Sequence, residues 1–282
     1  MVTQEEPLVV GTDGSAQSRL AVSWAAAEAA RRATAVRVVS VNDDPHLDEK
    51  LWTDLETLVE ETRHEYPEVE LYPKIARGHP AAELVRRSCE APLVVVGSRG
   101  RSPLRATLLG SVSTKVATHA HCPVVVVRNQ ANGAGDVVVG LDDSGYSQAA
   151  LRFAFDAAAA RGTELVAVQV WQPVDPSAVL PMLDSDMRDL AESAERGLAE
   201  QLAGWSEQYP TVPVRRIARQ GHPVFELTCL GRDARLVVVG HRGRGGFTGL
   251  LMGSVATGVL QHATCPVAVV RRAPGLTTSP GR

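Results

Sequence analysis

Short apolar runs alternate along the chain with longer stretches in which apolar residues recur at helical spacing. The runs are continuous and rich in valine, which is typical of strands buried on both faces of a parallel sheet. Strands and helices in this order predict right-handed crossovers, with helices on both faces of the sheet. In the first half we predict strands over 8–11, 36–41, 69–76, 93–97 and 123–128, and helices over 15–32, 48–66 and 111–120, with one more helix starting at Pro80.

The whole pattern occurs twice. The segment VVGTDGS from Val9 matches VVGLDDS from Val138, an offset of 129 residues (138 − 9). Further on, Gly97 matches Gly240 at an offset of 143 residues (240 − 97), so the second copy is longer. A repeat of this kind indicates two copies of one structural unit. We therefore predict an α/β fold of two tandem open-sheet domains, each a five-stranded parallel sheet with helices on both faces: a first domain over 1–128, a linker over 129–135, a second domain over 136–272 and a flexible tail over 273–282.

A glycine-rich turn follows the fourth predicted strand in both copies. In the first copy, Gly97 and Gly100 are followed after nine residues by Gly110 and Ser111, which opens a helix. Glycine permits positive φ and close approach of the backbone to an anion, and a helix N-terminus offers N–H donors and the positive end of a dipole. A single turn of this kind has a purely steric explanation, but the preserved spacing favours a phosphate-binding site. Its counterparts in the second copy are Gly240, Gly243, Gly253 and Ser254.

Several other classes of protein are disfavoured. The sequence has no P-loop lysine after the glycines, and no dinucleotide-binding G-x-G-x-x-G opens the first helix. A net charge of −3 gives no general attraction to nucleic acid or anionic membranes, and the single RGRGG segment over 242–246 is weak evidence for nucleic acid. The apolar runs fall far short of the roughly 20 residues that span a bilayer. Residues 1–7 lack the features of a signal peptide, so we expect a cytoplasmic protein.

The motif G-2x-G-9x-G-[S/T], together with an aspartate after the first strand and a G-x-P segment in mid-domain, resembles the universal stress protein family. The similarity covers both halves almost end to end, and the tandem arrangement resembles actinobacterial members. The resemblance implies the fold of that family and ATP as the ligand, with or without Mg²⁺. The family contains ATP-binding members and members that lack the loop, so the resemblance specifies the family more sharply than the ligand.

The resemblance also implies a role for each motif residue. The aspartates Asp13 and Asp142 would face the nucleoside, and Val41 and Val170 would line the adenine pocket. The ribose and phosphates would be held by the residues of the glycine-rich turns, namely Gly97, Gly100, Gly110, Ser111, Gly240, Gly243, Gly253 and Ser254.

Simpler interpretations of some of these residues stay open. Asp13 precedes Gly-Ser at a strand end, so an Asx turn that caps the first helix explains it equally well. The two valines are also plain core residues. The loop arginines could meet phosphate oxygens, although solvated arginines are commoner; they are Arg99, Arg101, Arg242 and Arg244.

Residues outside the motif have structural interpretations. His119 and His262 recur near the end of the last helix of each copy, where a histidine meets the negative end of the helix dipole. Cys122 and Cys265 each precede a proline at the start of an apolar strand, so we expect buried free thiols.

The residues favour a nucleotide-binding regulator or sensor, and the family resemblance implies that it acts in a stress or dormancy response. Apart from the aspartate after the first strand, no acidic loop residue recurs in both copies, so we assign no catalytic residue and no metal ligand, and slow ATP hydrolysis stays open. The alternatives are a nucleotide hydrolase or adenylyl-transfer enzyme on a related scaffold, and a nucleotide-independent interaction protein. Expected partners are ATP and an unidentified regulatory protein, with no membrane and no nucleic acid.

Two expectations concern assembly and asymmetry. The apolar fifth strands would lie at sheet edges, and the family resemblance implies that the two halves meet there as a pseudo-dimer, with a homodimer also open. We further expect tighter binding at the second site, because three glycines of its loop are replaced in the first loop by Ser102, Pro103 and Ala106. The glycines are Gly245, Gly246 and Gly249.

Overall fold

The computed structural model describes residues 6–100, 109–128, 135–142, 144–172, 184–243 and 251–271. The predicted linker over 129–135, except its last residue, and the predicted tail over 273–282 lie outside this part, as do both stretches of loop that the predicted asymmetry compares.

The first half contains the predicted elements, with boundaries shifted by about two residues or fewer. Its strands form a parallel sheet in the order β3-β2-β1-β4-β5. Helix α3 begins at Pro80, as predicted, because the fixed φ of proline suits the first helical position. In chain order the elements are β1 (Leu8–Thr12), α1 (Ala16–Arg32), β2 (Val36–Val41), the short 3₁₀ helix η1 (Pro45–Leu47), α2 (Asp48–Glu65), β3 (Leu71–Ala76), α3 (Pro80–Arg87), β4 (Val94–Gly97), α4 (Ser111–His119) and β5 (Val124–Val127).

The second half repeats this topology, with its parallel strands in the order β8-β7-β6-β9-β10. Its additional length lies between β7 and β8, where α7 follows α6. The elements are β6 (Val137–Leu141), α5 (Gly145–Arg161), β7 (Leu165–Trp171), α6 (Asp184–Leu202), α7 (Trp205–Gln208), β8 (Val214–Gln220), α8 (Pro223–Leu230), β9 (Leu236–Gly240), α9 (Ser254–His262) and β10 (Val267–Val270).

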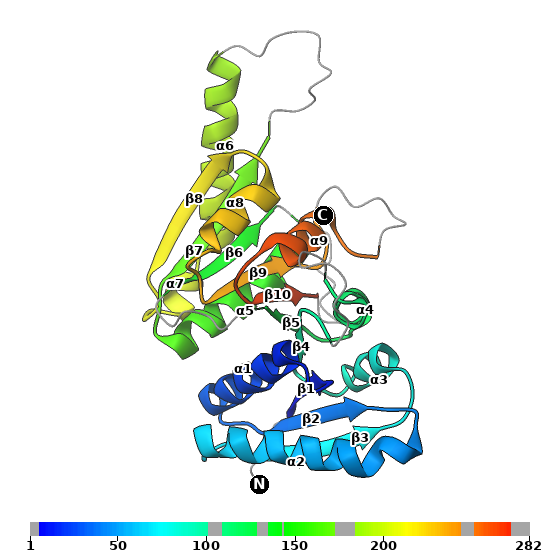
Figure 1. The fold of residues 1–282 in the computed structure, drawn as a ribbon. Helices are drawn as coiled ribbons and strands as arrows, with labels where there is room; N and C mark the ends of the chain where they lie inside the picture. Colours follow the sequence, from blue (N-terminus) through cyan, green and yellow to red (C-terminus); the bar gives the residue numbers. More distant parts are fainter. Residues whose placement is uncertain are drawn as a thin grey trace, which may run out of the picture.

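The two halves meet where β5 and β10 pair in antiparallel orientation (Figure 1), and this pairing joins them into one ten-stranded sheet. The register places Val125 opposite Ala268 and Val124 opposite Val269. All four residues are buried. Each fifth strand, apolar and exposed at an edge in an isolated half, thereby gains a hydrogen-bonding neighbour.

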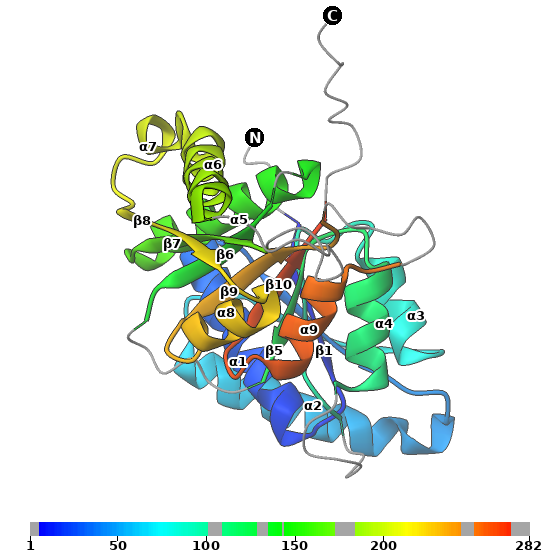
Figure 2. The same ribbon diagram turned by 90° about the horizontal axis from the view of Figure 1, so that it is seen from above.

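Helices cover both faces of this sheet (Figure 2). One hydrophobic core lies under α1, α2, α5 and α6, and the other lies under α3, α4, α8 and α9. Consecutive strand residues such as Val9 and Val10 belong to opposite cores, and both are at most 1% exposed. The valines of each continuous run therefore pack alternately into the two cores. Among the described residues, no helix combines the length and apolar character needed to cross a membrane.

Candidate functional site

Two cavities lie at corresponding places in the two halves, at the carboxyl ends of the central strands. The first, of about 450 Å³, lies at the ends of β1, β2 and β4 and extends to the start of α4. The second, of about 540 Å³, lies at the ends of β6, β7 and β9 and extends to the start of α9. The strand order reverses direction between β1 and β4, and between β6 and β9, which is where open α/β sheets bind their ligands.

The structure gathers every predicted site residue into these two cavities. Asp13, Val41, Gly97, Gly100, Gly110 and Ser111 line the first cavity. Asp142, Val170, Gly240, Gly243, Gly253 and Ser254 line the second.

The strand-end aspartates have a structural contact in addition to their place in the cavity wall. Asp13 Oδ1 accepts a hydrogen bond from the backbone N–H of Ser15 at 3.0 Å, which is the Asx turn considered above. Asp142 Oδ1 accepts the equivalent bond from Ser144 at 3.1 Å and a second one from the hydroxyl of Ser147 at 2.7 Å. The turn holds each carboxylate at its cavity, so the two interpretations are compatible.

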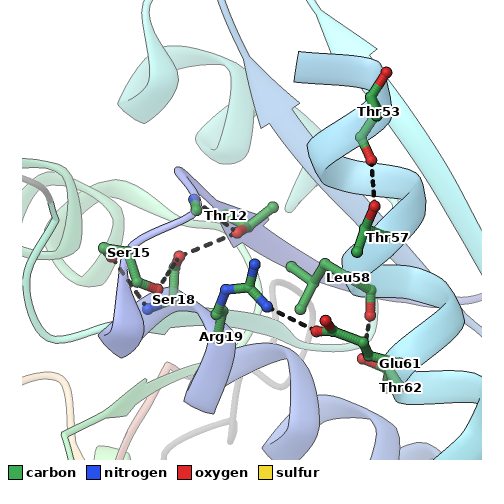
Figure 3. A network of polar contacts seen from close by, with 10 residues as sticks. Thr12, Ser15, Ser18, Arg19, Thr53, Thr57, Leu58, Glu61 and Thr62 are labelled. Carbon is green, nitrogen blue, oxygen red and sulfur yellow. Dashed lines mark hydrogen bonds and ion pairs between the residues drawn. The ribbon is translucent and has the colours of Figure 1, made fainter. Parts of the chain in front are cut away.

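The same turn fixes the start of α1 (Figure 3). The hydroxyls of Thr12 and Ser18 lie 3.0 Å apart, and Ser15 Oγ accepts a hydrogen bond from the backbone N–H of Ser18. Thr12 and Ser18 also line the first cavity, whereas Leu141 replaces the threonine in the second. The first cavity therefore has a hydroxyl on this wall that the second lacks.

Steric contacts account for three of the motif glycines, Gly97, Gly100 and Gly243, and the expected role of positive φ is wrong. Among the described residues, the glycines with positive φ do not include any of those in the two motifs. A Cβ on Gly97 would lie 2.8 Å from the carbonyl oxygen of Gln17 in α1, so this glycine lets helix and strand pack closely. A Cβ on Gly100 would lie 2.5 Å from Asp13 Oδ2. Gly97 therefore serves packing, while Gly100 leaves room for the carboxylate.

The N-termini of α4 and α9 are open toward the cavities. Gly110 and Gly253 are the N-cap residues, and neither helix has a side-chain hydrogen bond at its cap. The first residues of each helix, Ser111 and Val112 in α4, line the cavity. Uncapped N–H groups and the positive end of the helix dipole favour an anion at this position.

One arginine lines each cavity. Arg99 and Arg242 are half-buried and line the first and second cavity, so the interpretation as solvated loop residues is wrong for both. Their Nε atoms are buried and have no hydrogen-bond partner among the residues that the structure describes. A buried guanidinium N–H without a partner is costly, and a phosphate oxygen is a suitable acceptor for it. Arg101 and Arg244 lie outside the described residues.

Several wall residues were missed by the motif analysis. Gly11 and Gly140 lie on the central strands, and a Cβ there would come within 2.7 Å of Cδ1 of Leu84 and Leu227. These leucines reach over the strand from α3 and α8 and form an apolar wall. The repeat contains the signal that could have found them, because each residue recurs at one of the two offsets. Further lining residues include Pro80 and Val39 in the first cavity, and Pro223, Val168, Met252 and Gln172 in the second.

No group of three or more His, Cys, Asp or Glu side chains suited to a metal occurs in the part of the chain that the structure describes. Cys122 and Cys265 are buried free thiols, as expected, and burial raises their pKa to about 12 and about 11. His119 and His262 are the exposed last residues of α4 and α9.

Comparison with known proteins extends over both halves. A sequence model of the universal stress protein family matches residues 6–128 and 134–271. A universal stress protein of Mycobacterium tuberculosis is 37% identical over 292 residues, which cover 95% of this chain and 98% of that protein. One from Mycolicibacterium smegmatis is 38% identical over 293 residues, covering 95% and 97%. The crystal structure of a universal stress protein from Archaeoglobus fulgidus matches with a TM-score of 0.69 at 20% identity, covering 96% of this chain and 98% of that one.

Proposed function

This chain belongs to the universal stress protein family, and we propose that it is an ATP-binding regulator whose nucleotide occupancy changes its contacts with a partner protein. The observation that carries the proposal is the paired cavity, in which an uncapped helix N-terminus lies beside an arginine whose buried Nε has no partner among the described residues. This combination is suited to phosphate. Volumes of about 450 and 540 Å³ fall in the usual range for small-molecule sites.

The walls of each cavity divide into an apolar and an anion-binding part. In the first, Val39, Val41 and Leu84 would contact the adenine ring, and the start of α4 with Gly100 and Arg99 would hold the phosphates. Asp13 lies between these parts as the acidic residue among the lining residues and would accept hydrogen bonds from the ribose hydroxyls.

Binding and signalling fit these residues better than turnover. Phosphoryl transfer needs a base or a metal-holding group at the terminal phosphate, and the acidic residue among the lining residues of each cavity is tied into a turn. If Mg²⁺ accompanies ATP, its contacts would come from the phosphates and water, with at most this carboxylate. We expect the protein to act in the cytoplasm, as the internal pseudo-dimer or as a homodimer of it.

Calorimetric titration with ATP tests the proposal. The wild type should show binding, and Gly243→Glu should lose the second site, because the new side chain would meet Asp142 and repel phosphate. The matched control is Thr53→Glu, which adds the same charge on the exposed face of α2. Unchanged binding in a folded Gly243→Glu variant contradicts the site. Mg²⁺-dependent multiple turnover would favour the hydrolase alternative, and absence of any nucleotide binding would favour the interaction protein.

A further inference from the structure

Each half ends in an arginine that reaches into the other half. Arg128 follows β5, and its Nη2 donates a hydrogen bond to the carbonyl oxygen of Leu260 in α9 at 2.9 Å. Arg271 follows β10, and its Nη2 donates to the carbonyl of Thr118 in α4. The residue that corresponds to Leu260 is Ala117, and its carbonyl oxygen lies 3.5 Å from the same Nη2 of Arg271, so the two contacts differ by one residue under the repeat.

These arginines cap the helices that begin at the cavities. The last carbonyls of a helix have no partner within the helix, and a cation there is also favoured by the dipole. Helix α4 has nine residues and is therefore about 13 Å long. Its first residue, Ser111, lines the first cavity, while its last turn is held by an arginine of the second half. Helix α9 shows the reverse arrangement.

Each capping arginine also lies near the cavity arginine of its own half, because the residues that precede the two arginines are joined by a backbone hydrogen bond of 2.7 Å, from Ser98 to Val127 in the first half and from His241 to Val270 in the second. After burial, the charge of Arg99 is the next cause that lowers the pKa of Arg128, and Arg242 has the same effect on Arg271. Both pairs therefore hold two positive charges in a partly desolvated place. A phosphate bound at Arg99 or Arg242 would relieve the repulsion within the pair.

A histidine adds a further link on one side only. His241 lies in the second loop between Gly240 and Arg242, and it is 3% exposed. Its Nε2 lies 2.6 Å from Arg271 Nη2, from which it accepts a hydrogen bond when neutral. The corresponding residue of the first loop, Ser98, has its hydroxyl 3.5 Å from Gln17 within its own half.

We propose that the two nucleotide sites are positively coupled, each through the cavity helix of the other half. Phosphate at one loop arginine lets the neighbouring capping arginine bind the helix carbonyls of the other half more firmly. That helix presents its N-terminus to the second nucleotide, which is then bound by a better-ordered site. The inference rests on the proposed function, because it assumes an anionic ligand in both cavities.

Coupling between two binding sites is reciprocal, so ATP at the first site changes the affinity of the second by the same factor as ATP at the second changes the affinity of the first. We expect ATP at either site to tighten the other about fivefold or more, within the usual range for coupled sites. His241 should increase this factor for both sites, although its contact is made from one loop only.

Titration calorimetry measures the coupling. Gly100→Val and Gly243→Val each block one site with uncharged bulk, so that no new carboxylate imitates phosphate beside an arginine. The product of the two association constants of the wild type should exceed the product of the association constants measured in Gly100→Val and in Gly243→Val about fivefold or more. When Arg128→Met and Arg271→Met are added to all three chains, these two products should be equal. Arg215→Met, which removes a half-exposed arginine of β8, is the matched control and should leave the excess intact.

Hydrogen exchange gives a second measurement that does not depend on affinity. In Gly100→Val, ATP fills the second site alone, and the amides in the last turn of α4 should exchange more slowly when it binds. Arg271→Met should abolish this protection, and His241→Ser should weaken it. If both sites bind ATP, but the two products of association constants are equal and α4 gains no protection, the coupling is overturned and the proposed function stands. Absence of binding at both sites overturns both.

Discussion

Asp142 and Gly243 lie so close together that a Cβ on the glycine would be 2.4 Å from Asp142 Oδ2. The carboxylate cannot easily turn away, because its other oxygen accepts hydrogen bonds from Ser144 and Ser147. Asp13 and Gly100 repeat the relationship at 2.5 Å. The glycine at this position of each loop is therefore required by the aspartate that faces it.

This contact predicts the effect of adding a single methyl group. Gly243→Ala should weaken ATP binding at the second site about tenfold, since either the loop or the carboxylate must shift, and tenfold corresponds to about 1.4 kcal/mol. Calorimetry on the Gly100→Val background isolates that site. The effect should largely disappear when Asp142→Ala is already present. A Gly243→Ala effect of equal size with and without Asp142 would show that the steric account is wrong.

A buried ion pair joins the two halves on the face opposite the cavities. Glu28 in α1 is 1% exposed, and it accepts a hydrogen bond from Arg161 of α5 at 2.6 Å and another from Arg32 at 2.7 Å. Burial would raise the pKa of Glu28, but the charges of Arg161 and Arg32 outweigh it and hold the pKa below its ordinary value. The guanidinium of Arg161 also lies over the ring of Trp24, 5.7 Å from its centre.

Removal of this carboxylate should be strongly destabilising. Glu28→Ala leaves the buried charge of Arg161 without its partner, which typically costs about 3–5 kcal/mol of unfolding free energy. The matched control is Glu61→Ala, which breaks the exposed pair with Arg19 seen in Figure 3 and should cost less than about 1 kcal/mol. Urea unfolding of both variants measures the difference. Equal losses would contradict a special role of the buried pair.

Much of this fold was accessible from the sequence, and the reasons are local. The valine runs, the proline at the start of α3 and the repeat predicted the parallel halves, and the rule on strand order predicted where the two cavities lie. The partner of Glu28 was not accessible, because Arg161 is 133 residues away and the position that repeats Glu28 is Ala157. The steric role of Gly100 also needed coordinates, since only they show the aspartate beside it.

The buried side chain of His241 should make the stability of the protein depend on pH in the acid range. Burial, followed by the charge of Arg271, lowers its pKa from 6.5 to about 4. The Thr118 carbonyl, 3.3 Å from Nε2, opposes this shift, while Arg242 and His119 add to it. Between these two pH values the unfolded chain binds a proton that the folded chain does not, so this residue makes stability fall as pH falls from 6.5 to 4. The loss is on the order of 3 kcal/mol, at about 1.4 kcal/mol per unit of pKa.

The variant His241→Ser gives the second loop the serine that the first loop has at the corresponding position, Ser98. Its unfolding free energy, measured by urea at several pH values, should change less between pH 6.5 and 4 than that of the wild type. His262→Ser, which replaces the exposed last residue of α9, should keep the wild-type slope in this window. If the wild type and His241→Ser lose stability in parallel, His241 is not the group that titrates.

The two halves should each provide one nucleotide site, and native mass spectrometry counts these sites directly. Protein stripped of small molecules and mixed with ATP should gain two nucleotide masses in the wild type, one in Gly100→Glu, one in Gly243→Glu, and none when both substitutions are combined. Thr53→Glu should gain two. A wild type that gains no nucleotide, or a folded double variant that still gains two, would contradict the account.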